Sequence, residues 1–265
     1  MAHAPLRACR IARFADNRTA TIPDDRNFQM RLRIALILCA AFGASTSAPC
    51  APAAEPVRQL AINLPPFYVA AASPAAPPAV AVDPAYDALL ASTDGARIRK
   101  ARDAIAAHPD LVKPETMMVL AIRLYDTGLR DDAVFWYYAG RDRFVTMEAV
   151  LDMRSLRLAR TAETVDSFIK AVGPAIDGYA LCNVERHQER DDRAIEWVAA
   201  HPYKLLGYSD LPAQSEDRNA ALAAAVGNLR EASVNNALQM ANPEMRAQLA
   251  DYRKSTEADA RYCWK

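Results

Sequence analysis

Glycine and lysine are scarce in this sequence, and neither sign of charge is in excess. Only 8 of the 265 residues are glycine, whereas a β-sandwich or propeller would need many more glycine-marked turns. Basic and acidic residues number 32 each. The chain therefore lacks the basic excess with which nucleic-acid binders displace counterions, and we expect no nucleic-acid partner.

The sequence motifs of the common enzyme classes are also missing. There is no GxSxG, HExxH or CxxC motif. Gly173 and Gly178 have the spacing of a phosphate-binding loop, but Tyr179 and Ala180 stand where that loop needs lysine and serine or threonine. We therefore predict no catalytic residues, no metal ligands and no cofactor.

Alanine, in contrast, makes up about a fifth of the chain. Alanine loses no side-chain entropy in a helix, so this composition favours helices over sheets. We predict an all-α fold, a helical bundle with hairpins. Helices are expected at 86–107 with an interruption at Gly95, and further along the chain at 114–126, 131–144, 148–158, 162–172, 175–182, 190–200, 215–229 and 244–262.

The N-terminal region has the pattern of a secretory signal. Basic residues at 30–33 precede an apolar stretch at 34–44, and small residues with proline follow up to residue 54. We predict that 1–29 are an over-called start or a leader and that 30–53 are a signal peptide, cleaved after Ala48 or Ala53. The apolar stretch is shorter than the ~20 residues that span a bilayer, so membrane contact is expected only through the uncleaved signal.

Export would leave a mature chain with two cysteines and a proline-rich start. Nine of the 17 prolines lie between positions 49 and 84, so we predict a Pro/Ala-rich tether at 54–83 and an all-α domain at 84–265. The remaining cysteines are Cys182 and Cys263. In an oxidising compartment they are expected to form a disulfide, and two unrelated buried cysteines are the alternative.

One segment carries a resemblance to a known repeat. Residues 117–140 resemble a tetratricopeptide or Sel1-like hairpin at Leu120, Leu124, Gly128, Ala133 and Tyr137. No second copy follows at the 34-residue period of such arrays. A looser echo pairs residues 130–136 with 190–197. The resemblance implies a concave surface that binds a peptide or protein, whereas two hairpins of an ordinary bundle are the alternative.

Two groups of side chains are candidates for function. The aromatic run Phe135 to Tyr138 covers more than one helix face. Either all four side chains pack in the core, or Trp136, Tyr137 and Tyr138 anchor a binding surface. The second group is His187, Glu189 and Asp191, of which His187 and Asp191 share a helix face. Two ligands do not make a metal site, and a solvated charged face is the alternative.

Export, helical hairpins and missing catalytic motifs together favour a periplasmic or secreted protein-interaction module. Its partner would be another envelope protein, or a secreted effector that it neutralises as an immunity protein. A small envelope hydrolase that uses carboxylates around His187 is one alternative. A structural domain without a partner of its own is another. A groove lined by Trp136, Tyr137 or Tyr138 would favour binding, and a pocket lined by His187, Glu189 and Asp191 would favour the enzyme.

Overall fold

The computed structural model describes residues 54–73 and 75–264, and these residues fold mainly into helices, as the composition predicts. The expected leader at 1–29, the signal peptide at 30–53 and its cleavage sites lie outside the described residues. None of the helices in the described part combines the length and apolar character needed to cross a bilayer. The helices are α1 (Asp87–Leu90), α2 (Gly95–Ala106), α3 (Pro114–Asp126), α4 (Arg130–Val150), α5 (Ala159–Ala180), α6 (Val184–Ala200), the 3-10 turn η1 (Lys204–Gly207), α7 (Arg218–Ala241), α8 (Pro243–Ser255) and α9 (Ala258–Tyr262).

The hairpin predicted around Gly128 is present. Helices α3 and α4 are joined by three residues, and Gly128 has a φ of 81°, a conformation that glycine adopts without strain. A Cβ at Gly140 would come within 3.2 Å of the Met117 side chain, so the far end of α4 lies against the start of α3. The two helices are therefore antiparallel.

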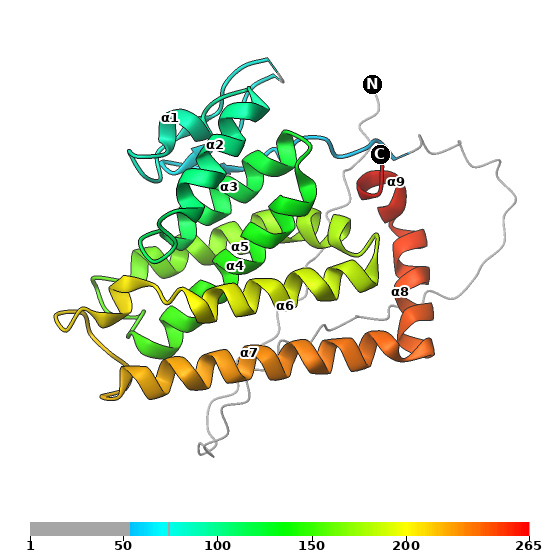
Figure 1. Ribbon diagram of the computed structural model, residues 1–265. Coiled ribbons are helices and arrows are strands. Elements are labelled where there is room, and N and C mark those ends of the chain that lie inside the picture. The colour runs from blue at the N-terminus through cyan, green and yellow to red at the C-terminus, as the bar shows by residue number, and fades with distance from the viewer. Residues whose placement is uncertain (1–53, 74, 265) are drawn as a thin grey trace, which may run out of the picture. The chain divides into compact units, whose positions relative to one another are not determined.

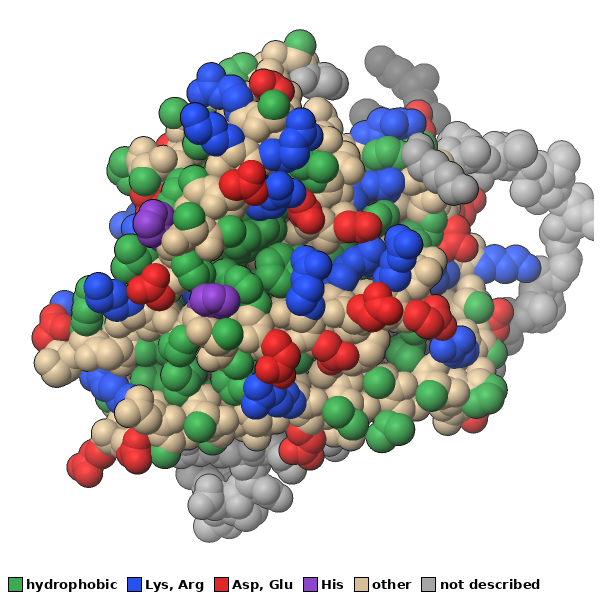
Figure 2. Space-filling model, viewed as in Figure 1, with side chains coloured by type: hydrophobic (Ala, Val, Ile, Leu, Met, Phe, Trp, Pro, Cys, Tyr) green, Lys and Arg blue, Asp and Glu red, His purple; other side chains and the backbone are tan. Residues whose placement is uncertain are grey.

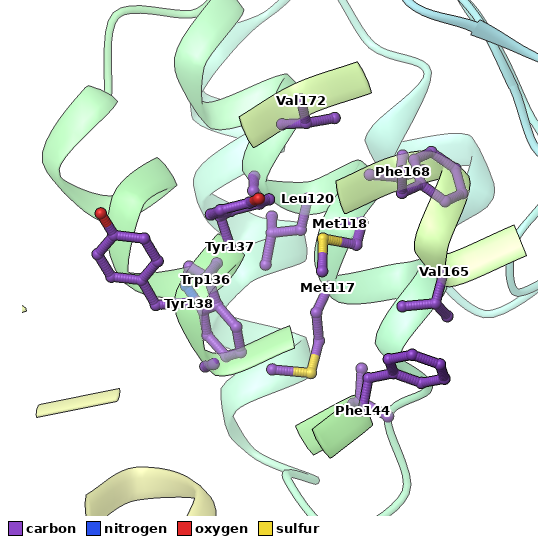
Figure 3. Close-up of a cluster of buried hydrophobic side chains, with 14 of the residues drawn as sticks. Met117, Met118, Leu120, Trp136, Tyr137, Tyr138, Phe144, Val165, Phe168 and Val172 are labelled. Atoms are coloured by element: carbon purple, nitrogen blue, oxygen red, sulfur yellow. The ribbon is translucent and has the colours of Figure 1, made fainter. Parts of the chain in front are cut away.

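Helix α4 is the central element of the bundle, because α3, α5, α6 and α7 all pack against it (Figure 1). A helix enclosed on all sides needs apolar or aromatic side chains all round. Figure 3 shows part of the resulting core, in which side chains from α3, α4 and α5 meet. Its labelled members are Met117, Met118, Leu120, Trp136, Tyr137, Tyr138, Phe144, Val165, Phe168 and Val172.

Two predicted helix breaks do not occur. Helix α4 continues through residues 145–147, and α5 passes through Gly173 and Pro174 without a break. Pro174 lies on the exposed side of α5. Helix α7 also extends to Ala241, beyond the predicted helix end at residue 229. In α4 and α5, burial of one helix face outweighs the local preference for a break.

Residues 54–83 are not a free tether. They form a small antiparallel sheet of β1 (Asn63–Leu64), β2 (Tyr68–Val69) and β3 (Ala79–Val80), in that order. Register pairs Leu64 with Tyr68 and Val69 with Ala79. The few bulky residues of this segment explain the difference, because Leu60, Tyr68 and Val82 are buried in the core.

Candidate functional site

A charged cleft opens between the start of α4 and the outer face of α6. It encloses about 370 Å³, and Figure 2 shows basic and acidic side chains gathered over α6. The lining residues are Asp131, Asp132, Arg186, Glu189, Arg190 and Arg193. The two aspartates stand in the first turn of α4, where carboxylates favour the positive end of the helix.

Three of the cleft's charges are matched within the molecule. Arg190 pairs with Asp131 at 2.5 Å, and the hydroxyl of Tyr179 donates to the same carboxylate at 2.6 Å. Asp132 pairs with Arg102 from α2. These contacts bring α2, α4, α5 and α6 together at one rim of the cleft.

The other cleft charges come from one face of α6. Arg186, Glu189 and Arg193 are spaced i, i+3 and i+7, so all three side chains emerge along one line, and all are exposed. Among the described residues, no carboxylate forms an ion pair with Arg186 or Arg193. The Arg193 guanidinium lies over the Phe135 ring at 4.2 Å, which fixes its position without neutralising its charge. The cleft therefore offers two guanidinium forks and one carboxylate to a ligand.

A separate polar cluster is buried between α4, α5 and α6. Arg141 pairs with Asp142 and Asp191, both at 2.8 Å, and lies over the Tyr138 ring. The Tyr138 hydroxyl donates to Asp177 at 3.1 Å. Burial raises the pKa of Asp142 to about 6, although Arg141 opposes this shift. One Asp142 oxygen, Oδ2, has no hydrogen-bond partner among the described residues.

The sequence-predicted residues His187, Glu189 and Asp191 do not converge. The His187 ring packs edge to face on Tyr138 at 5.7 Å, and burial lowers the pKa of this histidine. Asp191 turns inward to Arg141, whereas Glu189 lines the outer cleft. Residues 54–73 and 75–264 contain no group of histidine, cysteine or carboxylate side chains placed to hold a metal ion.

The predicted aromatic binding surface is wrong. Trp136, Tyr137 and Tyr138 are only 3%, 2% and 1% exposed, because α4 is enclosed on all sides. They line neither the α4–α6 cleft nor the second hollow, which lies beside the small sheet. The Trp136 ring instead packs against Trp197 of α6 at 5.3 Å. The two echoing segments, 130–136 and 190–197, thus lie on two helices that pack together.

A second hollow of about 290 Å³ lies where the small sheet meets α3. At its floor Arg123 pairs with Asp126 at 2.7 Å and donates to the carbonyl oxygens of Leu90 and Ser92. Asp126 also accepts from the backbone of Leu60 at 2.8 Å. These hydrogen bonds join the segment before β1 and the end of α1 to α3. The polar groups of this hollow therefore have a structural role.

The chain has a relative among known proteins. It is 32% identical over 210 residues to a protein of Haemophilus influenzae (strain Rd), which is described only as an uncharacterised protein. The matched region covers 79% of this chain and 81% of the relative. The chain belongs to the same family as this Haemophilus protein. No model of a known protein family and no solved structure matches it.

Within this family member, sequence reasoning missed the role of the two free arginines. Of Arg186 and Arg190, only Arg190 forms an ion pair with a carboxylate among the described residues. The i, i+3, i+7 spacing of Arg186, Glu189 and Arg193 was a usable indication of one shared face. That this face borders an open cleft depends on α4 and could not be read from α6 alone.

Proposed function

We propose that the protein is an exported protein-interaction module that holds an acidic segment of an envelope partner in the α4–α6 cleft. The observation that carries the proposal is the pair Arg186 and Arg193, two exposed guanidinium groups that face one cleft without a carboxylate partner among the described residues. Guanidinium forks pair with carboxylates in two-bond geometry, which provides both affinity and orientation.

The cleft also has features that suit a protein rather than a lone ion. Glu189 lies between the two arginines along α6, so a partner segment with a basic residue flanked by acidic residues would complement all three. Asp131 and Asp132 are already engaged by Arg190 and Arg102 and do not repel an acidic ligand as free charges would.

Export is supported by two independent features. The basic, apolar and small-residue order of 30–54 has the pattern of a secretory signal. Cys182 and Cys263 lie at disulfide distance, with Cα atoms 5.6 Å apart, and such pairs persist in oxidising compartments.

The cleft is tested with the variant Arg186→Glu/Arg193→Glu. Envelope proteins that co-purify with the wild type are identified by mass spectrometry, and the dissociation constant of each purified partner is then measured. We expect a partner whose dissociation constant rises roughly 100-fold in the variant, since two charge-assisted contacts become repulsive. The affinity of the wild type should also fall as salt is added.

The matched control is Arg154→Glu/Arg160→Glu, which makes the same charge change at exposed positions outside the cleft. It should bind the partner as the wild type does. Equal binding by the cleft variant and the wild type would contradict the proposal, as would equal weakening by both variants, which indicates an effect of net charge alone.

A further inference from the structure

Helix α7 differs from the other long helices in its charge. Only three of its 24 residues are charged, namely Arg218, Arg230 and Glu231, whereas eight of the 17 residues of α6 are charged. It lies along one edge of the bundle beside α6, and few charged side chains appear along that edge (Figures 1 and 2). Most of its surface is open to solvent, since its buried residues are Ala225, Val226 and Ser233. A long exposed helix with so few charges is an unusual surface for a protein with 24% charged residues.

One line of exposed residues runs along α7 on the side opposite its buried face. Starting from Ala220, steps of four and three residues reach only exposed positions, and the last of them is Ala241. This 3.5-residue period is the one that paired helices use for their contact seam. The seam residues are Ala220, Ala224, Gly227, Glu231, Val234, Leu238 and Ala241. They lie opposite the buried face of α7, so the bundle itself cannot cover them.

The two halves of this seam differ in size. The first half carries alanine and Gly227, at which an added Cβ would meet no atom within 4 Å. The second half carries Val234 and Leu238, which are 59% and 65% exposed. A second α7 laid antiparallel would place the large half of each helix against the small half of the other, which keeps the spacing between the helices constant.

The central charges lie at the two-fold axis of such a pair. Glu231 is the one charged residue of the seam and lies near its midpoint, next to Arg230. In an antiparallel pair with residue 220 opposite residue 241, Glu231 of one copy lies beside both Glu231 and Arg230 of the other, so Arg230 offsets the repulsion between the two carboxylates. Arg230 already contacts Glu196 of its own chain at 2.6 Å, and at 52% exposed its guanidinium can also donate to a second carboxylate.

We propose that α7 is a self-association surface, on which a second copy of this chain packs its own α7 in antiparallel orientation. The resulting contact is two-fold symmetric, as most homodimer interfaces are, and runs along a helix of about 36 Å. It uses a face separate from the α4–α6 cleft, so it stands or falls independently of the proposed function.

The first test is the oligomeric state of the protein as the cell produces it, measured by sedimentation over a range of concentrations. We expect a dimer that Val234→Arg/Leu238→Arg converts to monomer, with a dissociation constant raised roughly 100-fold or more because each change occurs twice in the interface. Both side chains are exposed in the single chain, so the melting temperature of the monomer should not change. Tyr252→Glu alters an equally exposed side chain on α8 and should leave the dimer intact.

The second test is cross-linking of two single-cysteine variants, Ala220→Cys and Ala241→Cys, with a short bismaleimide. In the antiparallel pair, residue 220 of one copy lies about 30 Å from residue 220 of the other but close to residue 241. We expect dimeric cross-links only when the two variants are mixed. Cross-linking of either variant with itself would overturn the antiparallel arrangement. A monomer at all concentrations, as when another segment of the same chain covers α7, would overturn the proposal, and so would a dimer that the arginine variant leaves unchanged.

Discussion

Glycines 173 and 178, which have the spacing of a phosphate loop, instead mark two close contacts. An added Cβ at Gly173 would lie 2.7 Å from the Tyr137 hydroxyl, and one at Gly178 would lie 2.5 Å from the Tyr262 ring. Real side-chain atoms do not approach so closely. Both glycines therefore let α5 approach aromatic residues of α4 and α9, and their spacing reflects packing rather than phosphate binding.

The buried carboxyl of Asp142 makes stability depend on pH in an unusual direction. Its pKa is about 6 in the folded protein, against 3.8 without burial. The folded state therefore binds this proton more tightly than the unfolded chain, and the stabilising contribution is complete below pH 3.8. It is lost as the pH rises through 6, and by pH 7 the loss amounts to about 3 kcal/mol.

Asp142→Asn should remove this dependence, because asparagine keeps the shape of the neutral acid and carries no proton to lose. Relative to the wild type, the free energy of unfolding of the variant should rise by about 3 kcal/mol from pH 4 to pH 7. Urea unfolding at both pH values measures this difference, with Asp103→Asn at an exposed position as the matched control. A difference that stays constant between the two pH values would show that Asp142 does not titrate as described.

Helices α3 and α4 show how a short connection sets a contact. The three residues between them are so few that α4 must pack against α3, and the apolar stripe of α3 at Met117, Leu120, Ala121 and Leu124 is fully buried. Ala133 is fully buried at the start of α4, where a small residue lets the two helix backbones approach.

Ala133→Trp should overpack this contact and lower the free energy of unfolding by roughly 1–3 kcal/mol or more. Thermal melting and urea titration measure the loss. Ala247→Trp on α8 adds the same side chain at an exposed position and should melt close to the wild type. A wild-type melting curve for Ala133→Trp would mean that the hairpin contact is not tightly packed.

At the scale of the whole molecule, the C-terminal segment closes onto the start of the described chain. The backbone of Val57 donates to the carbonyl of Arg261 at 2.8 Å. Arg130, at the start of α4, donates to the carbonyls of Tyr262 and Trp264. Cys182 and Cys263 join the same region, and the chain-entropy model assigns such a cross-link, which closes a loop of 81 residues, roughly 4–5 kcal/mol.

Export and this cross-link can be tested on one sample. We expect protein from the native envelope to have its N-terminus between Pro49 and Glu55, and its mass to be two hydrogens below that of the dithiol form. N-terminal sequencing and mass spectrometry with and without reduction measure both. A cytoplasmic product that begins at Met1 would contradict export, and two free thiols in unreduced protein would contradict the disulfide.

Local sequence was sufficient to predict the class of fold, the hairpin at Gly128 and the pairing of the two cysteines. Helix periodicity, a turn that needs glycine and the count of cysteines are properties of short segments or of composition. The aromatic run Phe135 to Tyr138 shows what local sequence cannot predict, namely which side chains are buried. Four successive aromatic residues indicate a helix that is apolar on most faces, but only the packing of α3, α5, α6 and α7 around α4 decides that all are buried.

The same dependence on distant neighbours explains the other differences. Leu60 and Tyr68 are two of the few bulky residues in a Pro/Ala-rich segment. They belong to the core only because this segment packs against the helices. Arg186 and Arg193 are two of 26 arginines, and only the position of α4 leaves them facing a cleft. Periodicity along one segment thus determined the helices of this protein. Which of their faces are covered was decided by the tertiary structure, because burial depends on residues that the chain brings in from far away.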